Sequence, residues 1–164
     1  MKKVIEGNVD LSKLHLTELF DLSDVEVTGY FNCRRNNLTN LEGGPQTVGG
    51  SFNCSNNSLT SLEGCPHTVG GSFSCGYNNL TSLEGAPHTV DLFFDCHNNN
   101  LTSLKGGPHT VGYDYYCDGN NLRSLEGIPT TIGESLYLDK SLKDKFPEEY
   151  IRSLCKIKGN VKYV

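Results

Sequence analysis

The chain has 164 residues, 36% of them hydrophobic, and its 19 acidic and 14 basic side chains give a net charge of −5. Residues 43–133 hold seven acidic and two basic side chains, whereas the charges of the two ends cancel. Such acidity repels phosphate backbones and argues against nucleic-acid binding, although a merely solvated surface would look the same. No apolar run has membrane-spanning length or follows Met1 as a signal peptide would, so we expect a protein of the reducing cytoplasm without membrane contact.

The first segment, residues 5–26, is a degenerate copy of a unit that repeats regularly after it. Val9, Leu11 and Leu16 have the spacing of the apolar residues in that unit. Leu14 stands where the regular copies have Asn. Because a solenoid needs a cap over its end, we expect this segment to form an N-terminal capping coil.

A unit of 21 residues then repeats five times without a gap over residues 27–131. Each copy has the pattern Val-x-x-x-Phe-x-Cys-x-x-Asn-x-Leu-x-x-Leu-x-Gly-x-Pro, with Tyr115 for Phe in the last. Periods of 20 to 29 residues with apolar residues and one Asn at fixed offsets are typical of solenoids, in which each repeat packs against its neighbours. Residues at equivalent positions of the five copies form columns. The three main columns are Phe31, Phe52, Phe73, Phe94 and Tyr115; Cys33, Cys54, Cys75, Cys96 and Cys117; and Asn36, Asn57, Asn78, Asn99 and Asn120.

One copy predicts one coil. Phe52 and Cys54 are separated by one polar residue, an alternation that indicates a short parallel strand with both residues inward. Asn57 follows where the strand must turn, and its amide can satisfy exposed backbone groups. The inward position of the cysteines favours a role as small apolar filler, with metal or redox chemistry as the alternative, and Cys65 and Cys155 lie outside their column.

The last segment, residues 132–164, is expected to form a final coil and a C-terminal cap, which makes about seven strands in all. Leu136 and Leu138 occupy the Phe and Cys columns. Pro147 and the two acids after it predict the start of a helix, which would end near Lys156 to Gly159. Tyr150, Ile151 and Leu154 would form its apolar face, and residues 161–164 are expected to form a strand.

The offsets Phe52, Cys54, Asn57 and Leu59 match the pattern L-x-x-L-x-L-x-x-N-x-L from its second position onward, so the chain resembles leucine-rich repeat proteins. Val48 departs from the pattern, since it lies four places before Phe52 instead of three. The segments GSFNCSNN (50–57) and LTSLEGAP (80–87) resemble the short repeat proteins of tailed bacteriophages and some bacteria. The resemblance implies one domain over residues 1–164: a mainly β, right-handed leucine-rich repeat solenoid with parallel strands and a turn-rich convex side.

Catalytic or metal chemistry has little support in the sequence. His67, His88 and His109 form a column in the turns, but Gln46 and Thr130 interrupt it, so a polar turn is favoured over a metal site. A thiol nucleophile would be buried in the cysteine column. The sequence holds no phosphate loop, nucleophile elbow or dinucleotide fingerprint. We therefore expect no enzymatic activity and no cofactor.

The outward strand positions vary while the buried pattern does not. Small polar residues in the first copies give way to aromatic and acidic residues in the last ones, which are typical interface anchors for a partner with a basic surface. The predicted partner-binding residues are Phe93, Asp95, His97, Asp114, Tyr116, Asp118, Tyr137 and Asp139. We expect a monomeric, non-enzymatic protein-binding module, which the phage resemblance directs at a host enzyme or defence component. The alternatives are neutral variation of a solvated sheet, or a structural element that self-associates or attaches to a virion through its ends.

Overall fold

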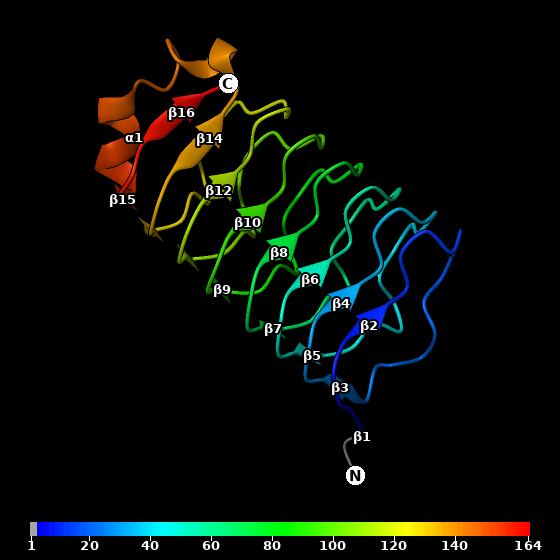
Figure 1. Ribbon diagram of the computed structural model, residues 1–164. Helices are drawn as coiled ribbons and strands as arrows, with labels where there is room; N and C mark the ends of the chain where they lie inside the picture. Colours follow the sequence, from blue (N-terminus) through cyan, green and yellow to red (C-terminus); the bar gives the residue numbers. More distant parts are fainter. Residues whose placement is uncertain (1–2) are drawn as a thin grey trace.

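The computed structural model describes residues 3–164 and is a parallel β-solenoid with a single α-helix near its C-terminal end (Figure 1). Most coils contribute two short strands, one after the other. The first strand of each coil is β1 (Lys3–Ile5), β3 (Val25–Val27), β5 (Thr47–Val48), β7 (Thr68–Val69), β9 (Thr89–Val90), β11 (Thr110–Val111), β13 (Thr131–Ile132) or β15 (Lys156–Ile157). The second is β2 (Val9–Asp10), β4 (Phe31–Asn32), β6 (Phe52–Asn53), β8 (Phe73–Ser74), β10 (Phe94–Asp95), β12 (Tyr115–Tyr116), β14 (Leu136–Leu138) or β16 (Val161–Tyr163).

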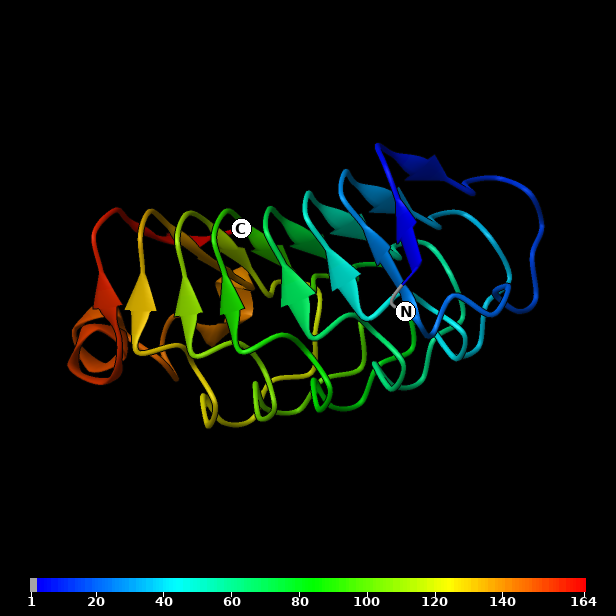
Figure 2. The ribbon, with the colours of Figure 1, turned by 90° about the horizontal axis from the view of Figure 1, so that it is seen from below.

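The second strands form one eight-stranded parallel sheet that runs the whole length, from β2 to β16. The first strands form two four-stranded sheets, β1-β3-β5-β7 and β9-β11-β13-β15. The eight-stranded sheet and the row of first strands run side by side along the solenoid, with the helix at its C-terminal end (Figure 2). The expectation of one strand per coil was therefore wrong. The four-residue gap between Val48 and Phe52 exists because Val48 belongs to a strand of its own.

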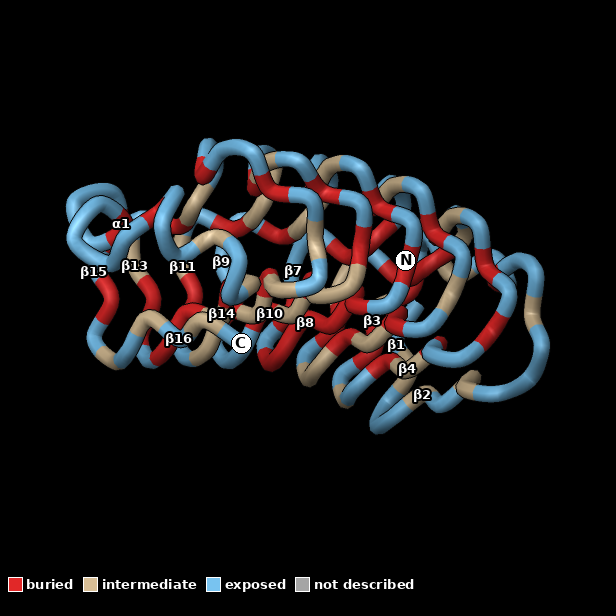
Figure 3. Tube along the Cα trace, turned by 90° about the horizontal axis from the view of Figure 1, so that it is seen from above, coloured by how far each residue is buried: buried red, intermediate tan, exposed pale blue. Residues whose placement is uncertain are grey.

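The period of 21 residues places identical side chains next to one another on adjacent coils. Phe52 pairs with Phe31 on one side and with Phe73 on the other. Their rings stack with centroids 5.7 and 5.4 Å apart, and the stack ends at Tyr115. This column, together with the valine and leucine columns, is almost completely buried, so the core is a continuous strip inside the coils (Figure 3).

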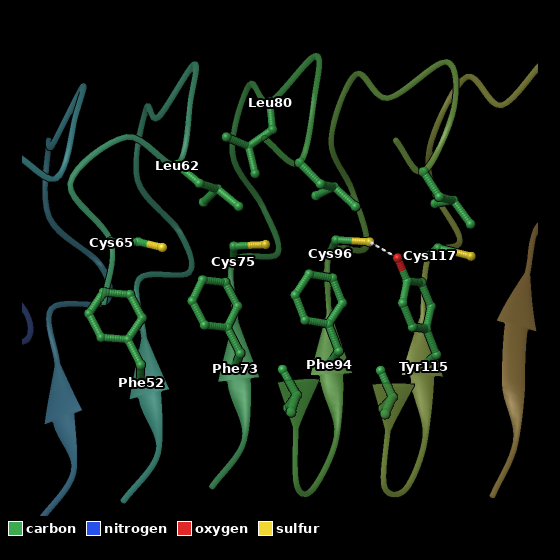
Figure 4. Close-up of a cluster of buried hydrophobic side chains, with 14 of the residues drawn as sticks. Phe52, Leu62, Cys65, Phe73, Cys75, Leu80, Phe94, Cys96, Tyr115 and Cys117 are labelled. Atoms are coloured by element: carbon green, nitrogen blue, oxygen red, sulfur yellow. Dashed lines mark hydrogen bonds between the residues drawn. The ribbon is translucent and has the colours of Figure 1, made fainter. Parts of the chain in front are cut away.

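The five column cysteines are fully buried. Figure 4 shows three of them, Cys75, Cys96 and Cys117, beside the aromatic stack. The thiols of Cys54, Cys96 and Cys117 donate to carbonyl oxygens of the next coil, as Cys96 does to Tyr116 at 3.3 Å. Burial raises the pKa of Cys33 to about 12 and also raises the pKa of the other four, so these thiols stay protonated. Cys65 and Cys155, which lie outside the column, are buried as well, and Cys65 donates to the Gly85 carbonyl at 2.9 Å.

The asparagine column joins each coil to the one before it. The Asn78 side-chain oxygen accepts from the Leu59 backbone N–H at 3.0 Å. Its amide nitrogen donates to the carbonyls of Cys54 and Cys75 at 3.1 and 3.0 Å. Asn57, Asn99 and Asn120 repeat this arrangement in their own coils. The amides bond backbone groups, which fixes both the bend and the distance between coils.

The C-terminal cap consists of a short 3₁₀ helix, η1 (Lys140–Leu142), and the helix α1 (Glu148–Leu154). Ile151 is buried, but Tyr150 and Leu154 are 47% and 44% exposed, so the expected three-residue apolar face was wrong. The helix also ends earlier than predicted, because Lys156 and Ile157 pair with β13 as strand β15. The final strand β16 then pairs with β14 and adds an eighth strand where about seven were expected.

A seam interrupts the first-strand sheet between β7 and β9. The residue directly after the strand valine forms a column of its own, which is glycine in most coils. A Cβ added to Gly70 or Gly112 in this column would lie 2.2 or 2.0 Å from a carbonyl oxygen of the preceding coil. Asp91 occupies this column, so its coil cannot approach β7 as closely. Gly70 and Gly112 donate to Val48 and Val90 across the coils, but within residues 3–164 the Asp91 N–H has no matching bond to Val69. Two other side chains occupy this column, Thr28 and Lys158. The backbone N–H groups of both donate to the preceding coil, to Ile5 and Ile132, but their offsets from that coil are 22 and 25 residues instead of 21.

Replacing Asp91 with Gly is expected to close this seam. The new hydrogen bond to Val69 should slow native-state amide exchange at residue 91 by about fivefold, the effect of one added bond of about 1 kcal/mol. Hydrogen exchange followed by NMR measures this, with Asp91→Asn as the control that retains a Cβ. Equal exchange in the Gly and Asn variants would show that the side chain does not cause the seam.

Candidate functional site

The outward side chains of the eight-stranded sheet, here called the strand face, change character along the solenoid. In the coil of β4 they include Tyr30 and Arg34, which border a shallow hollow of about 330 Å³. On the coil of β8 they are Ser72, Ser74 and Gly76, small residues that are themselves buried. From β10 onward they are larger and include Phe93, Tyr116 and Tyr137. The strand face therefore has a basic N-terminal end, a middle with small side chains and a C-terminal end with larger side chains.

The C-terminal end of the strand face contains a hollow of about 450 Å³ over β10 to β16, here called the aromatic hollow. It is lined by Phe93, Asp95, His97, Tyr116, Asp118, Tyr137 and Val164. Six of the eight residues predicted from the sequence thus lie together around one depression. The other two, Asp114 and Asp139, form hydrogen bonds with the lining residues or their neighbours.

Three aromatic side chains on successive coils form a row that lines the aromatic hollow. This row, here called the aromatic ridge, consists of Phe93, Tyr116 and Tyr137. The Phe93 and Tyr116 rings meet edge to face with centroids 6.3 Å apart, and the Tyr116 and Tyr137 rings stack at 4.4 Å. Lys162 on β16 lies over the Tyr137 ring, 4.6 Å from its centroid, and donates to the Tyr137 hydroxyl at 2.7 Å. That hydrogen bond raises the pKa of Lys162 and keeps it cationic. The ridge thus presents a large apolar surface on rigid strands.

Three of the four nearby carboxylates are engaged within the protein. Asp95 contacts the His97 ring and accepts from the His97 backbone N–H at 3.0 Å. Asp114 accepts from the Tyr116 hydroxyl at 3.1 Å, and burial together with this carboxylate raises the pKa of Tyr116. Asp139 accepts from the Gly119 backbone N–H at 2.9 Å. These bonds position the ridge and the turns beside it.

Asp118 is the exception. Within residues 3–164 its carboxylate accepts no hydrogen bond from another residue and forms no ion pair. Its pKa is raised, chiefly because burial removes water from it. A hydrogen bond from its own backbone N–H and the nearby His97 oppose this rise, and the carboxylates of Asp139 and Asp95 add to it. A partly desolvated carboxylate with acidic neighbours is electrostatically suited to a cation from outside.

His97 is held at the edge of the aromatic hollow by its neighbours. A Cβ on Gly76 would lie 2.6 Å from the His97 Nδ1, so the glycine in the preceding coil provides the space for this ring. Tyr77 contacts the His97 ring edge to face at 4.6 Å. Tyr77 is bulky and has a φ of +55°, in a column where the other coils have Arg35, Asn56, Asn98 and Gly119, all with positive φ. Its left-handed backbone is therefore set by the repeat and strained for this residue type.

The sequence prediction missed several residues of this region. Val164 lines the aromatic hollow because Leu138 pairs with Tyr163, which puts Val164 beside Asp139. Leu92 and Tyr113 are 41% and 53% exposed beside the hollow. They occupy a column that is glycine in the preceding coils, and this break in the pattern was the available signal. The positions of Val164 and Lys162 depend on a strand that follows the helix, outside the repeats.

Other candidate sites offer less. His88 and His109 stack with ring centroids 5.2 Å apart, and both are exposed in the turns with His67. Across residues 3–164, no group of three or more His, Cys, Asp or Glu side chains is arranged to hold a metal ion. The described part of the chain also has no helix with the length and apolar character needed to cross a membrane.

Fold and surface together define a repeat protein of the parallel β-solenoid class, with one aromatic and acidic hollow on its long sheet. Comparisons with models of protein families, with curated proteins and with solved structures found no match.

Proposed function

We propose that this protein is a non-enzymatic binding module that engages a protein partner through the C-terminal half of the strand face. The observation that carries the proposal is the aromatic ridge beside the carboxylates of the aromatic hollow. Aromatic side chains on rigid strands bury large areas at low cost in conformational entropy and are enriched among interface anchors. Neighbouring carboxylates favour a partner with a basic surface.

The target class follows from the resemblance of the repeats to leucine-rich repeat proteins of tailed phages. A phage protein of this kind would act in the cytoplasm of its host, as a monomer that binds a host enzyme or a defence component. The buried, protonated cysteines are compatible with a reducing compartment.

Truncation of Tyr116 tests the proposal once a partner has been isolated by tagged pull-down. Tyr116→Ala removes the central ring of the ridge and is expected to weaken binding more than tenfold, about 1.4 kcal/mol. Tyr113→Ala is the matched control, because Tyr113 is exposed nearby but does not line the hollow. Calorimetric titration of both variants, after each shows wild-type thermal unfolding, provides the comparison. Unchanged affinity for Tyr116→Ala would rule out the ridge as the binding element.

A second candidate function is assembly through the ends of the solenoid. The first coil exposes three apolar side chains, Val4 at 50%, Leu14 at 55% and Phe20 at 61%. Exposed apolar groups beside short edge strands favour association with another chain. Light scattering over a range of concentrations separates the two candidates, since assembly through the ends raises the mass with concentration and the strand-face function does not.

A further inference from the structure

Asp118 differs from the other carboxylates of the aromatic hollow in what it lacks. Asp95, Asp114 and Asp139 each accept hydrogen bonds from within the protein. Asp118 accepts none from another described residue, although it lines the same hollow and is partly withdrawn from water. A carboxylate in this environment gains more from an external cation than one on an open surface, because less water screens the interaction.

The walls of the aromatic hollow restrict which cation fits. Phe93 and Tyr116 border it, and their rings attract cations that lie over them. The protein itself uses this attraction at the end of the ridge, where the Lys162 ammonium lies over Tyr137. Lys162 thereby occupies the last ring of the ridge and leaves the part near Phe93, Tyr116 and Asp118 for a group from a partner.

We infer that the aromatic hollow binds the guanidinium group of an arginine side chain, with Asp118 as its counter-ion and the Phe93 and Tyr116 rings as the aromatic wall beside it. The inference rests on the proposed function and names the chemistry of the partner. A guanidinium is planar and weakly hydrated, so it can lie against an aromatic wall while two N–H groups on its edge bond both oxygens of one carboxylate. An ammonium is a compact and strongly hydrated charge that cannot combine these contacts.

The hollow is also large enough for more than the charged group. At about 450 Å³ it has room for the aliphatic part of the arginine side chain as well as for the guanidinium group. The small residues of the β8 coil, Ser72 and Ser74, leave the neighbouring part of the strand face low. A partner segment that inserts an arginine can therefore continue along the strand face toward β8.

NMR titration of isotope-labelled protein with N-acetyl-arginine amide tests the inference without the natural partner. The matched probes are the lysine analogue, which keeps the charge, and the citrulline analogue, which keeps the shape without charge. We expect arginine to shift the amides of residues 95–97 and 116–118 and to bind at least fivefold more tightly than lysine, with no shift from citrulline. Equal shifts from arginine and lysine, or no arginine shift at these amides, would overturn the inference.

Two variants assign the effect to the carboxylate. Asp118→Asn is expected to abolish the arginine shifts, whereas Asp91→Asn, which removes an exposed carboxylate outside the hollow, should leave them unchanged. Asp118→Glu should retain them in part, which controls for any disturbance of the coil. If Asp118→Asn still binds arginine, the assignment is wrong. Partner binding that depends on Tyr116 but not on Asp118 would defeat this inference alone, and arginine shifts without any effect of Tyr116→Ala on partner binding would defeat the proposed function alone.

Discussion

Asn78→Ala is expected to lower the free energy of unfolding by about 3 kcal/mol. The substitution leaves the buried Leu59 N–H without an acceptor and removes a donor from the Cys54 and Cys75 carbonyls. Each buried backbone group that loses its partner costs roughly 1–3 kcal/mol, and little solvent can replace the lost partner because Asn78 is only 8% exposed. Because the lost bonds join two coils, the effect includes the contact between neighbouring repeats.

Asn79→Ala is the matched control, since Asn79 is the same residue type one position later and is exposed. Chemical denaturation of both variants gives the comparison, and the control should stay within about 0.5 kcal/mol of wild type. Equal midpoints for the two variants would mean that the asparagine column does not hold the coils together.

The triple variant Phe93→Ser, Tyr116→Ser, Tyr137→Ser is expected to reduce partner binding more than a hundredfold, about 2.8 kcal/mol. The three serines reproduce the outward residues of the β8 coil, where Ser72 and Ser74 occupy the same columns. The fold should therefore survive while the apolar area of the ridge is lost. Clustered aromatic anchors supply most of the energy of such interfaces, which is why the expected effect is large.

The control for this variant replaces three exposed histidines in the turns by alanine, His67, His88 and His109. It changes as many residues on another side of the solenoid. Binding should be unchanged in the histidine variant and lost in the serine variant, as measured by surface plasmon resonance. The reverse result would place the interface on the turns.

The coils were predictable because the repeat period carries their structure. A side chain that recurs every 21 residues meets its own copies, so the inward Phe and Cys columns and the asparagine at the bend could be assigned from the sequence. The outward residues followed by alternation. Six of the proposed residues consequently lie around one hollow, from Phe93 to Tyr137.

The remaining features depend on contacts that the repeat pattern does not contain. The Thr-Val strands are two residues long, too short to show alternation. The seam at Asp91 depends on how closely a carbonyl of the previous coil approaches, a distance visible only in three dimensions. Val164 and Lys162 reach the aromatic hollow through the pairing of β16 with β14 after the helix, and no repeat predicts that register.

Hydroxyl-radical footprinting of the complex with the isolated partner tests the central claim most directly, because it reports the solvent exposure of aromatic side chains. The account predicts that partner binding protects Phe93, Tyr116 and Tyr137 from oxidation. Tyr30, at the other end of the strand face, and Tyr150, on the capping helix, should oxidise as they do in the free protein. Protection of Tyr150 or Tyr30 with an unprotected ridge would contradict the account and move the binding site away from the aromatic hollow.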